Sequence, residues 1–223
     1  IVATGFGVAV CAELVAPYAH IDLRGARFAV QGFGAVGIHA ARFLAQRGAM
    51  LVAVSDSQGA IFDPNGFSVD ALIKHNKSGH SLNTFPEGKA ISASDLVRVD
   101  CEIWIPAARP DVLNEQNIVD NKARLVLQGA NIPATEEAER WMHAHGILNI
   151  PDFIANSGGV ICASVEYHGG TETQAMALIE DRIRANTREV LDRAQQEKCA
   201  PRHAAVRMAK SRVAEAQAYR RHC

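Results

Sequence analysis

Short aliphatic runs alternate with helical patterns along most of the chain. The runs are apolar at successive positions, as in strands that are buried on both faces of a sheet. We predict strands at residues 27–32, 50–56, 101–107, 124–130 and 146–151. Between them, apolar residues three and four positions apart predict helices at 36–48, 67–77, 114–121 and 135–146. This alternation favours an α/β fold with a doubly wound, mostly parallel sheet covered by helices on both faces.

Different patterns occur at the two ends of the chain. Residues 1–20 form an apolar helical segment, and after Gly170 two amphipathic helices follow at 171–198 and 201–221. The first segment begins without a methionine and already within a helical pattern. We therefore expect residues 1–223 to be part of a longer protein, cut at a domain boundary.

Three glycines follow the first predicted strand in the stretch AVQGFGAVG, residues 29–37. A first glycine in this spacing permits a tight turn, a second lets the backbone approach a pyrophosphate, and a third lets helix and strand pack closely. The start of the following helix would attract the phosphates through its unpaired N–H groups and its dipole. A purely structural turn is the alternative. We expect the diphosphate of a dinucleotide to contact Gly32, Phe33, Gly34, Ala35, Val36 and Gly37.

An acidic residue ends the next predicted strand. Asp56 lies about 20 residues beyond the glycines, the spacing at which a carboxylate accepts hydrogen bonds from the adenosine ribose. Its charge would repel the 2′-phosphate of NADP, and Ser57, beside it, begins a stretch without a cation. These features favour NAD as the cofactor. NADP stays open because the fold could bring a lysine to the site, the candidates being Lys74, Lys77 and Lys89.

Composition excludes several partners. The chain has 23 Lys and Arg against 24 Asp and Glu, so it lacks the basic excess of a protein that binds nucleic acid or a membrane surface. No apolar run reaches the roughly 18 residues of a membrane span, and no signal peptide is evident. The five cysteines are scattered and form no C-x-x-C pair, which suits a reduced compartment. We therefore expect a cytoplasmic protein.

Four further stretches make a specific likeness visible: ATGFGV (3–8), PAA (106–108), QGANIPATEEAE (128–139) and IPDFIANSGGV (150–160). With the glycine loop and AVSDSQG, they resemble the glutamate/leucine/phenylalanine/valine dehydrogenases in order and spacing. The likeness extends to the closing segment at 204–216.

The resemblance implies a domain organisation. Proteins of this family have a first domain that holds the substrate and the catalytic lysine, and a second domain that binds the cofactor. Residues 1–223 would be the second, with an N-terminal helix at 1–20, a Rossmann-type core at 25–160 and C-terminal helices at 160–221. No lysine lies in a glycine-rich KGG context, so the substrate domain and its catalytic groups would be absent from this chain.

The resemblance also implies a reaction. It is the reversible, NAD(P)-dependent oxidative deamination of an L-amino acid to a 2-oxo acid and ammonia. The cofactor performs the hydride chemistry and the protein orients it. The longer protein would be a homo-oligomer, a hexamer by its family, and this chain alone would be inactive. A stand-alone module that senses NAD without catalysis is the alternative. A malic enzyme is a third, and the GAN and AN-GGV motifs argue against it.

Site residues follow from the matching positions. The nicotinamide and its ribose would lie beside Thr4, Ala107, Ala108, Asn131 and Asn156. Asparagine suits this role because it both donates and accepts hydrogen bonds. A helix cap, strand-end packing and a turn are the structural alternatives for the threonine, the alanines and the asparagines, respectively.

The substrate side chain would contact Val160 and Ala163. Glutamate-specific relatives carry a serine at the position of Ala163, and alanine suits an apolar amino acid better. The following VEYHGG is more typical of glutamate enzymes, so glutamate and an apolar amino acid both stay open. Gly158 and Gly159 would keep a helix start open for substrate and cofactor. We expect no metal site, since His143 and His145 are two positions apart and do not share a helix face.

Overall fold

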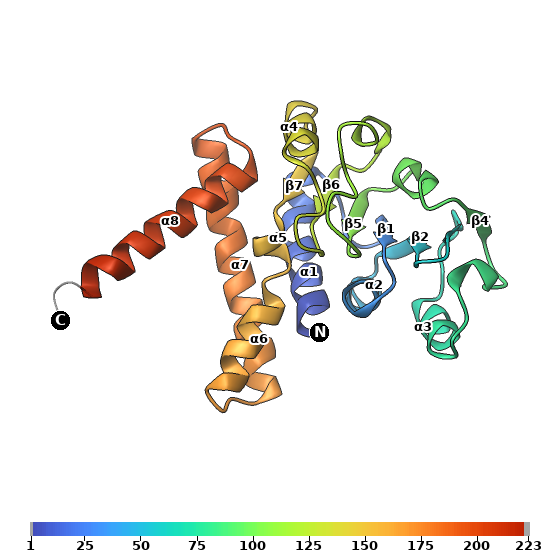
Figure 1. Ribbon diagram of the computed structural model, residues 1–223, viewed down its shortest axis with the longest axis horizontal. Coiled ribbons are helices and arrows are strands. Elements are labelled where there is room, and N and C mark those ends of the chain that lie inside the picture. Colours follow the sequence, from blue (N-terminus) through green and yellow to red (C-terminus); the bar gives the residue numbers. More distant parts are fainter. Residues whose placement is uncertain (1, 221–223) are drawn as a thin grey trace.

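Figure 1 shows the computed structural model, which describes residues 2–220. Within these residues lies a seven-stranded sheet with the order β4-β3-β2-β1-β5-β6-β7. Its strands are β1 (Arg27–Gln31), β2 (Met50–Ser55), β3 (Ala60–Phe62), β4 (Lys89–Ile91), β5 (Ile103–Pro106), β6 (Leu125–Leu127) and β7 (Leu148–Ile150). Residues 1 and 221, at the outer ends of the first and last predicted helices, lie outside the described residues.

The predicted strands all form, and they pair in parallel in the order β2-β1-β5-β6-β7. This arrangement confirms the predicted Rossmann-type α/β fold. Strands β3 and β4 were not predicted, and they extend one edge of the sheet in antiparallel pairing. Each has three residues, and β4 is mostly exposed, so neither shows an apolar run or an alternation long enough to recognise.

Side chains of the strands alternate between two cores. Phe28 and Val30 of β1 point into one buried cluster and Ala29 into the other. In β5, Ile105 and Trp104 divide between the clusters in the same way. Burial on both faces explains why these strands appear in the sequence as uninterrupted apolar runs.

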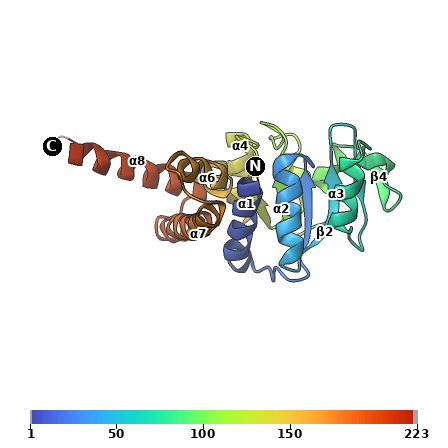
Figure 2. The same ribbon diagram turned by 90° about the horizontal axis from the view of Figure 1, so that it is seen from below.

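Helices cover the first cluster. They are α1 (Val2–Val15), α2 (Ala35–Gln46) and α3 (Val69–Lys77), which Figure 2 shows side by side. The second cluster lies under α4 (Glu136–Ala144), which Thr135 caps through a hydrogen bond from the Ala138 N–H, and under short 3₁₀ turns. The sheet is therefore covered on both faces, as predicted.

The helix predicted at 114–121 does not form. The segment contains only a 3₁₀ turn, Ile118–Asp120. The side chains of Asn114 and Asn117 bond to nearby backbone groups instead, among them the N–H of Gln116 and the carbonyl of Val112. Asparagine side chains that satisfy the backbone locally compete with helix formation.

Helix α1 is apolar on all sides because it packs against α2, α6 (Gly158–Tyr167) and α7 (Glu172–Gln196). This corrects the expectation that no segment is long and apolar enough to span a bilayer. Val2–Ala19 meets that test by length and composition, because the single charge of Glu13 does not outweigh its apolar residues. Of that stretch, 56% is buried, as in a helix at the centre of a fold.

The described part of the chain ends in four helices after β7. They are α5 (Asp152–Ala155), α6, α7 and α8 (Pro201–Arg220). Thr171 and Gln174 form a capping box at the start of α7. In α8, only the first turns are buried, and the helix then runs away from the body of the molecule (Figure 1). The first turns of α8 therefore make its buried contacts, and Arg212 further along the helix bonds to Asn186 and Glu189 of α7.

Candidate cofactor site

The sheet has a topological switch point between β1 and β5. From β1 the chain crosses to β2 on one side, whereas β5, β6 and β7 follow on the other. Ligands of open α/β sheets bind outside the carboxyl ends of the strands at such a point. Here the glycine loop follows β1, and Ala107 and Ala108 follow β5.

Each glycine of the loop has a distinct structural reason. Gly32 has a φ of +97°, and a Cβ there would lie 2.6 Å from the Cβ of Ala108. Gly37 is buried, and a Cβ would fall onto the carbonyl oxygen of Gly32. Gly34 precedes α2 and has no neighbour within 4 Å of the Cβ position. Close packing at Gly32 and Gly37 thus fixes the conformation of the loop, whereas its backbone is accessible at Gly34.

The start of α2 is free to receive an anion. No side chain caps it, so the first N–H groups of the helix are left without such a partner. The loop itself is tied to β2, because the N–H groups of Gly32 and Phe33 both donate to the carbonyl oxygen of Ser55, at 3.1 and 2.7 Å. The geometry therefore matches a diphosphate site at a helix N-terminus.

A cleft of about 870 Å³ opens over this loop. We call it the glycine-loop cleft. It brings together most of the residues predicted for the cofactor: Gly32, Phe33, Gly34, Ala35, Val36, Asp56, Ser57, Ala107 and Ala108. Gly37 lies beneath the loop and does not line the cleft.

A second cleft of about 500 Å³ continues from the first. We call it the asparagine cleft. It is lined by the remaining predicted cofactor residues, Thr4, Asn131 and Asn156, together with Val160. The two clefts share Val36, Ala107, Ala108 and Arg109. All of the predicted dinucleotide residues except Gly37 therefore line one continuous groove with two halves.

Of the two predicted substrate residues, only Val160 lines the groove. Val160 is 76% exposed, and Ala163, three positions further along α6, is also exposed. Their contact with a substrate stays a prediction. Gly158 is buried against the backbone of Ala3 in α1, so it serves packing between the two helices, whereas Gly159 lines the asparagine cleft beside Thr4.

The Asp56 carboxylate is engaged within the protein. One oxygen accepts hydrogen bonds from the N–H groups of Gln58 and Gly59, at 2.7 and 3.0 Å. The other accepts from the Ser81 hydroxyl and the Leu82 N–H, at 3.1 and 2.7 Å. A carboxylate has about four acceptor positions, so a ribose hydroxyl would have to share or displace one of these donors. Contact with the ribose stays a prediction.

These hydrogen bonds also affect acidity. Partial burial by itself raises the pKa of the Asp56 carboxyl, but the hydrogen bonds from Leu82, Gln58, Ser81 and Gly59 outweigh it and lower the pKa below its ordinary 3.8. Asp56 is therefore a charged residue at neutral pH, and it ties the segment around Ser81 to the end of β2.

Asn131 and Asn156 meet directly. The Asn156 amide donates to Asn131 Oδ1 at 2.9 Å and to the Ala130 carbonyl at 3.3 Å. Asn156 follows α5 at its C-terminal end, so it is not an N-cap. The pair joins the loop after β6 to the segment between α5 and α6. Its remaining donors and acceptors are available to a carboxamide or a hydroxyl.

Arg109 and Gln31 are among the groove residues that the sequence analysis missed. Arg109 lines both clefts, and none of the three candidate lysines lines either of them. Gln31, the last residue of β1, has a buried side-chain oxygen without a hydrogen-bond partner among the described residues, and it lines the glycine-loop cleft. Its place before the glycine loop was the available signal. A buried orphan acceptor and a cation in the groove fit a ligand that carries hydroxyl groups and a diphosphate.

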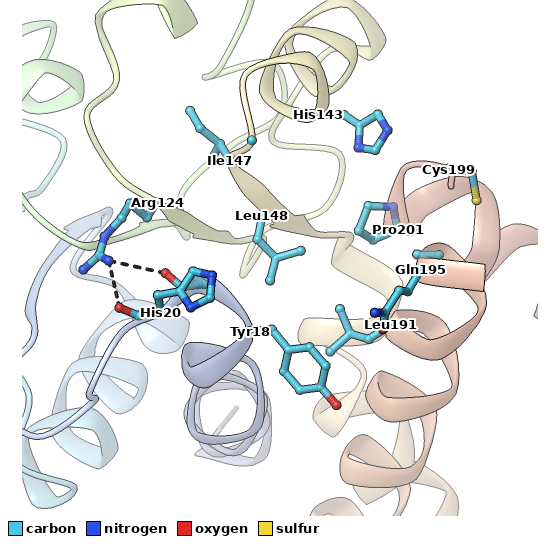
Figure 3. Close-up of a pocket in the computed structure, with 13 residues that line it drawn as sticks. Tyr18, His20, Arg124, His143, Ile147, Leu148, Leu191, Gln195, Cys199 and Pro201 are labelled. Atoms are coloured by element: carbon cyan, nitrogen blue, oxygen red, sulfur yellow. Dashed lines mark hydrogen bonds between the residues drawn. The ribbon is translucent and has the colours of Figure 1, made fainter. Parts of the chain in front are cut away.

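A third cleft lies at the opposite end of the sheet, where Arg124 and Leu148 mark the starts of β6 and β7 (Figure 3). Its volume is about 550 Å³. Arg124 donates to the carbonyl oxygens of Ala19 and His20 in it, at 3.4 and 2.8 Å. None of the residues predicted for the cofactor lines this cleft.

Fold and groove together define a Rossmann-type nucleotide-binding domain. The model of the Glutamate/Leucine/Phenylalanine/Valine dehydrogenase family matches residues 1–221. This chain therefore belongs to that family.

Curated relatives are similar to the chain along most of its length. A glutamate dehydrogenase of Aeropyrum pernix is 39% identical over 86% of the chain and 47% of its own length. An NADP-specific glutamate dehydrogenase of Saccharolobus shibatae is 38% identical over 81% of the chain and 44% of its own length. An NAD-specific one of Staphylococcus aureus is 35% identical over 97% of the chain and 54% of its own length. The chain thus spans about half the length of the curated relatives it matches.

A solved structure agrees with this placement. The hetero-hexameric glutamate dehydrogenase of Thermus thermophilus superimposes with a TM-score of 0.87, at 26% identity, over 98% of this chain and 53% of that one. The L-tryptophan dehydrogenase of Nostoc punctiforme shares the fold, with a TM-score of 0.77 at 24% identity.

Proposed function

We propose that this chain is the cofactor-binding domain of an amino-acid dehydrogenase that catalyses reversible oxidative deamination of an L-amino acid. The observation that carries the proposal is the continuous groove at the switch point between β1 and β5. Glutamate is the substrate that the names of the curated relatives favour. An apolar amino acid remains the alternative because of Ala163.

Within the groove, the residues of this chain would bind and orient a nicotinamide dinucleotide. The N–H groups at the start of α2 and the cation of Arg109 would hold its diphosphate. The Asn131–Asn156 pair would orient the nicotinamide end. When bound, the cofactor would accept the hydride from the amino acid.

The groove lacks a general base. Its only acid or base side chains among the described lining residues are Asp56 and Arg109. Asp56 is charged and already accepts four hydrogen bonds, and an arginine does not release its proton in a protein. Deamination requires a base close to the amine or the attacking water. We therefore propose that the base and most of the substrate site belong to an upstream segment of a longer parent.

The cofactor choice is part of the proposal. Relatives named NAD-specific and NADP-specific both match this chain, so membership of the family decides only that the cofactor is a nicotinamide dinucleotide. The charge of Asp56 and the absence of lysines from the groove favour NAD over NADP. We also propose a cytoplasmic, oligomeric parent. The described cysteines are free, and the Thermus relative is a hexamer.

The test compares this chain with its longer parent. Calorimetry should show NAD binding by residues 1–223, weaker than by the parent. Reduction of NAD should occur only with the parent, in a panel of glutamate, leucine, valine and phenylalanine. If the folded chain shows no binding of NAD at millimolar concentration, the proposed cofactor role is wrong. A parent that binds NAD but turns over no amino acid would favour the alternative of an NAD-sensing module.

A further inference from the structure

A buried polar cluster connects the start of α8 to the asparagine cleft. Its members are Gln128, Glu139, Asn149, Asp152 and Arg202. The first four are nearly inaccessible, with exposed fractions of 0, 7, 6 and 7%. We call it the Arg202 cluster. Two carboxylates buried this deeply require a cation and hydrogen bonds to stay charged.

Arg202 supplies that cation. Its Nε donates to Glu139 at 2.5 Å, and its Nη2 donates to Asp152 Oδ1 and to Gln128 Oε1, each at 3.0 Å. The Gln128 amide in turn donates to Glu139 and to Asn149, at 2.6 and 3.1 Å. One guanidinium from α8 thus holds Glu139 of α4, Gln128 just after β6 and Asp152 of α5 in a single arrangement.

The second oxygen of Asp152 reaches the loop after β6. Asp152 Oδ2 accepts a hydrogen bond from the Ile132 N–H at 2.8 Å. Ile132 has a φ of +48°, in the left-handed region that a β-branched residue rarely adopts. Its side chain is 60% exposed, so side-chain packing does not impose this conformation. Two hydrogen bonds to the Ile132 backbone hold it: the one from its N–H to Asp152 Oδ2, and one from the Asp111 N–H to the Ile132 carbonyl.

The strained residue directly follows Asn131. The constrained backbone of Ile132 thus lies next to the residue that lines the asparagine cleft and accepts the hydrogen bond from Asn156. Strain at a single backbone position persists only where surrounding contacts enforce it, and it is common beside ligand sites.

We propose that Arg202, at the start of α8, is a positioning residue for the asparagine cleft. Through Asp152 it holds Ile132 in the left-handed conformation that places Asn131 against the nicotinamide end of the cofactor. This inference rests on the proposed function, since it assumes that a nicotinamide dinucleotide occupies the groove. It goes beyond that function by assigning a role to a helix that does not line the asparagine cleft.

A carboxylate is the group that this connection needs. Asp152 accepts from Arg202 with one oxygen and from Ile132 with the other. An asparagine has one oxygen and one NH₂ group, so it can accept from only one of these two donors. The variant Asp152→Asn also leaves the Arg202–Glu139 pair intact and neutral, which spares the fold. It is therefore a sharper probe than Arg202→Gln, which would leave two buried carboxylates unpaired.

The experiment measures binding of NAD and of ADP-ribose, which lacks the nicotinamide, to D152N, R202Q and the wild type. D152N should weaken NAD binding about tenfold, as expected for one lost charge-assisted hydrogen bond, and leave ADP-ribose binding unchanged. R202Q should do the same if it folds. The matched control is R212Q on the same helix, because Arg212 bonds only to Asn186 and Glu189 of α7 among the described residues. Its affinities for both ligands should equal those of the wild type.

A second variant tests the route through Ile132. Asparagine tolerates the left-handed conformation, so I132N should restore most of the NAD affinity in the D152N background. Equal loss of NAD and ADP-ribose affinity in D152N, no loss at all, or no rescue by I132N would overturn the positioning role. Failure of the wild type to bind either ligand would instead contradict the proposed function.

Discussion

The two halves of the groove are built in different ways. The glycine-loop cleft comes mainly from one stretch of chain, in which β1, α2 and β2 follow one another. The asparagine cleft is assembled from α1, the loops after β5 and β6, and the start of α6. Its central loop depends further on Asp152 and Arg202. One half of the groove is therefore built by a local unit, whereas contacts from distant parts of the chain position the other half.

The largest effect on stability and binding should come from replacing Gly37, which supports the glycine loop. A Cβ at this position would fall onto the Gly32 carbonyl, so G37V must displace the loop or α2. We expect destabilisation by about 3 kcal/mol, with loss of detectable NAD and ADP-ribose binding. Thermal unfolding and calorimetry would measure both effects.

The control is G34A, because nothing lies within 4 Å of that Cβ position. G34A should keep wild-type stability and still weaken both ligands, since its methyl group would point toward the diphosphate path. If G37V bound ADP-ribose normally, the glycine loop would not be the unit that holds the adenosine end.

A smaller effect on stability is expected at Asp56, and it depends on pH. The pKa of its carboxyl is lowered in the folded protein, so its hydrogen bonds stabilise the fold above the ordinary value of 3.8. This contribution is lost as the pH falls through the lower folded pKa. D56N should be less stable than the wild type by about 1–3 kcal/mol at pH 7, and the two should converge once the pH falls below the lowered pKa of the folded protein. Urea unfolding at several pH values would test this, and a difference independent of pH would contradict it.

Asp56 also shows what sequence patterns capture and what they miss. Its spacing from the glycine loop identified the end of β2 because both lie within one local β-α-β unit. Its hydrogen bonds to Ser81 and Leu82 were not foreseen, since they join it to a segment without a recognisable pattern. Arg202 was missed for the same reason. In the sequence it is one of many arginines in an amphipathic helix, and only packing of α8 on α4 and α5 gives it two carboxylate partners.

Substitutions confined to the glycine-loop cleft should be enough to change the preference between NAD and NADP. In D56S/S57R the charge that repels a 2′-phosphate is removed and a cation is added. We expect the ratio of NAD to NADP affinity to fall about tenfold, the scale of one charge-assisted hydrogen bond. S57R alone is the control, and it should shift the ratio less. A wild type that already binds NADP more tightly than NAD would show that Asp56 does not discriminate between them.

The smallest effect is expected at Arg109, where the two halves meet. Arg109 is exposed and lines both clefts, next to the place where the diphosphate would pass from one to the other. Exposed cations contribute little in water, so R109Q should weaken binding only about threefold and reduce its dependence on salt. Because NAD and ADP-ribose share the diphosphate, both should weaken equally, in contrast to D152N, which should affect NAD alone. Calorimetry at low and high salt would separate the two patterns. If R109Q lost affinity for NAD but not for ADP-ribose, Arg109 would act in the asparagine cleft and not at the boundary between the two clefts.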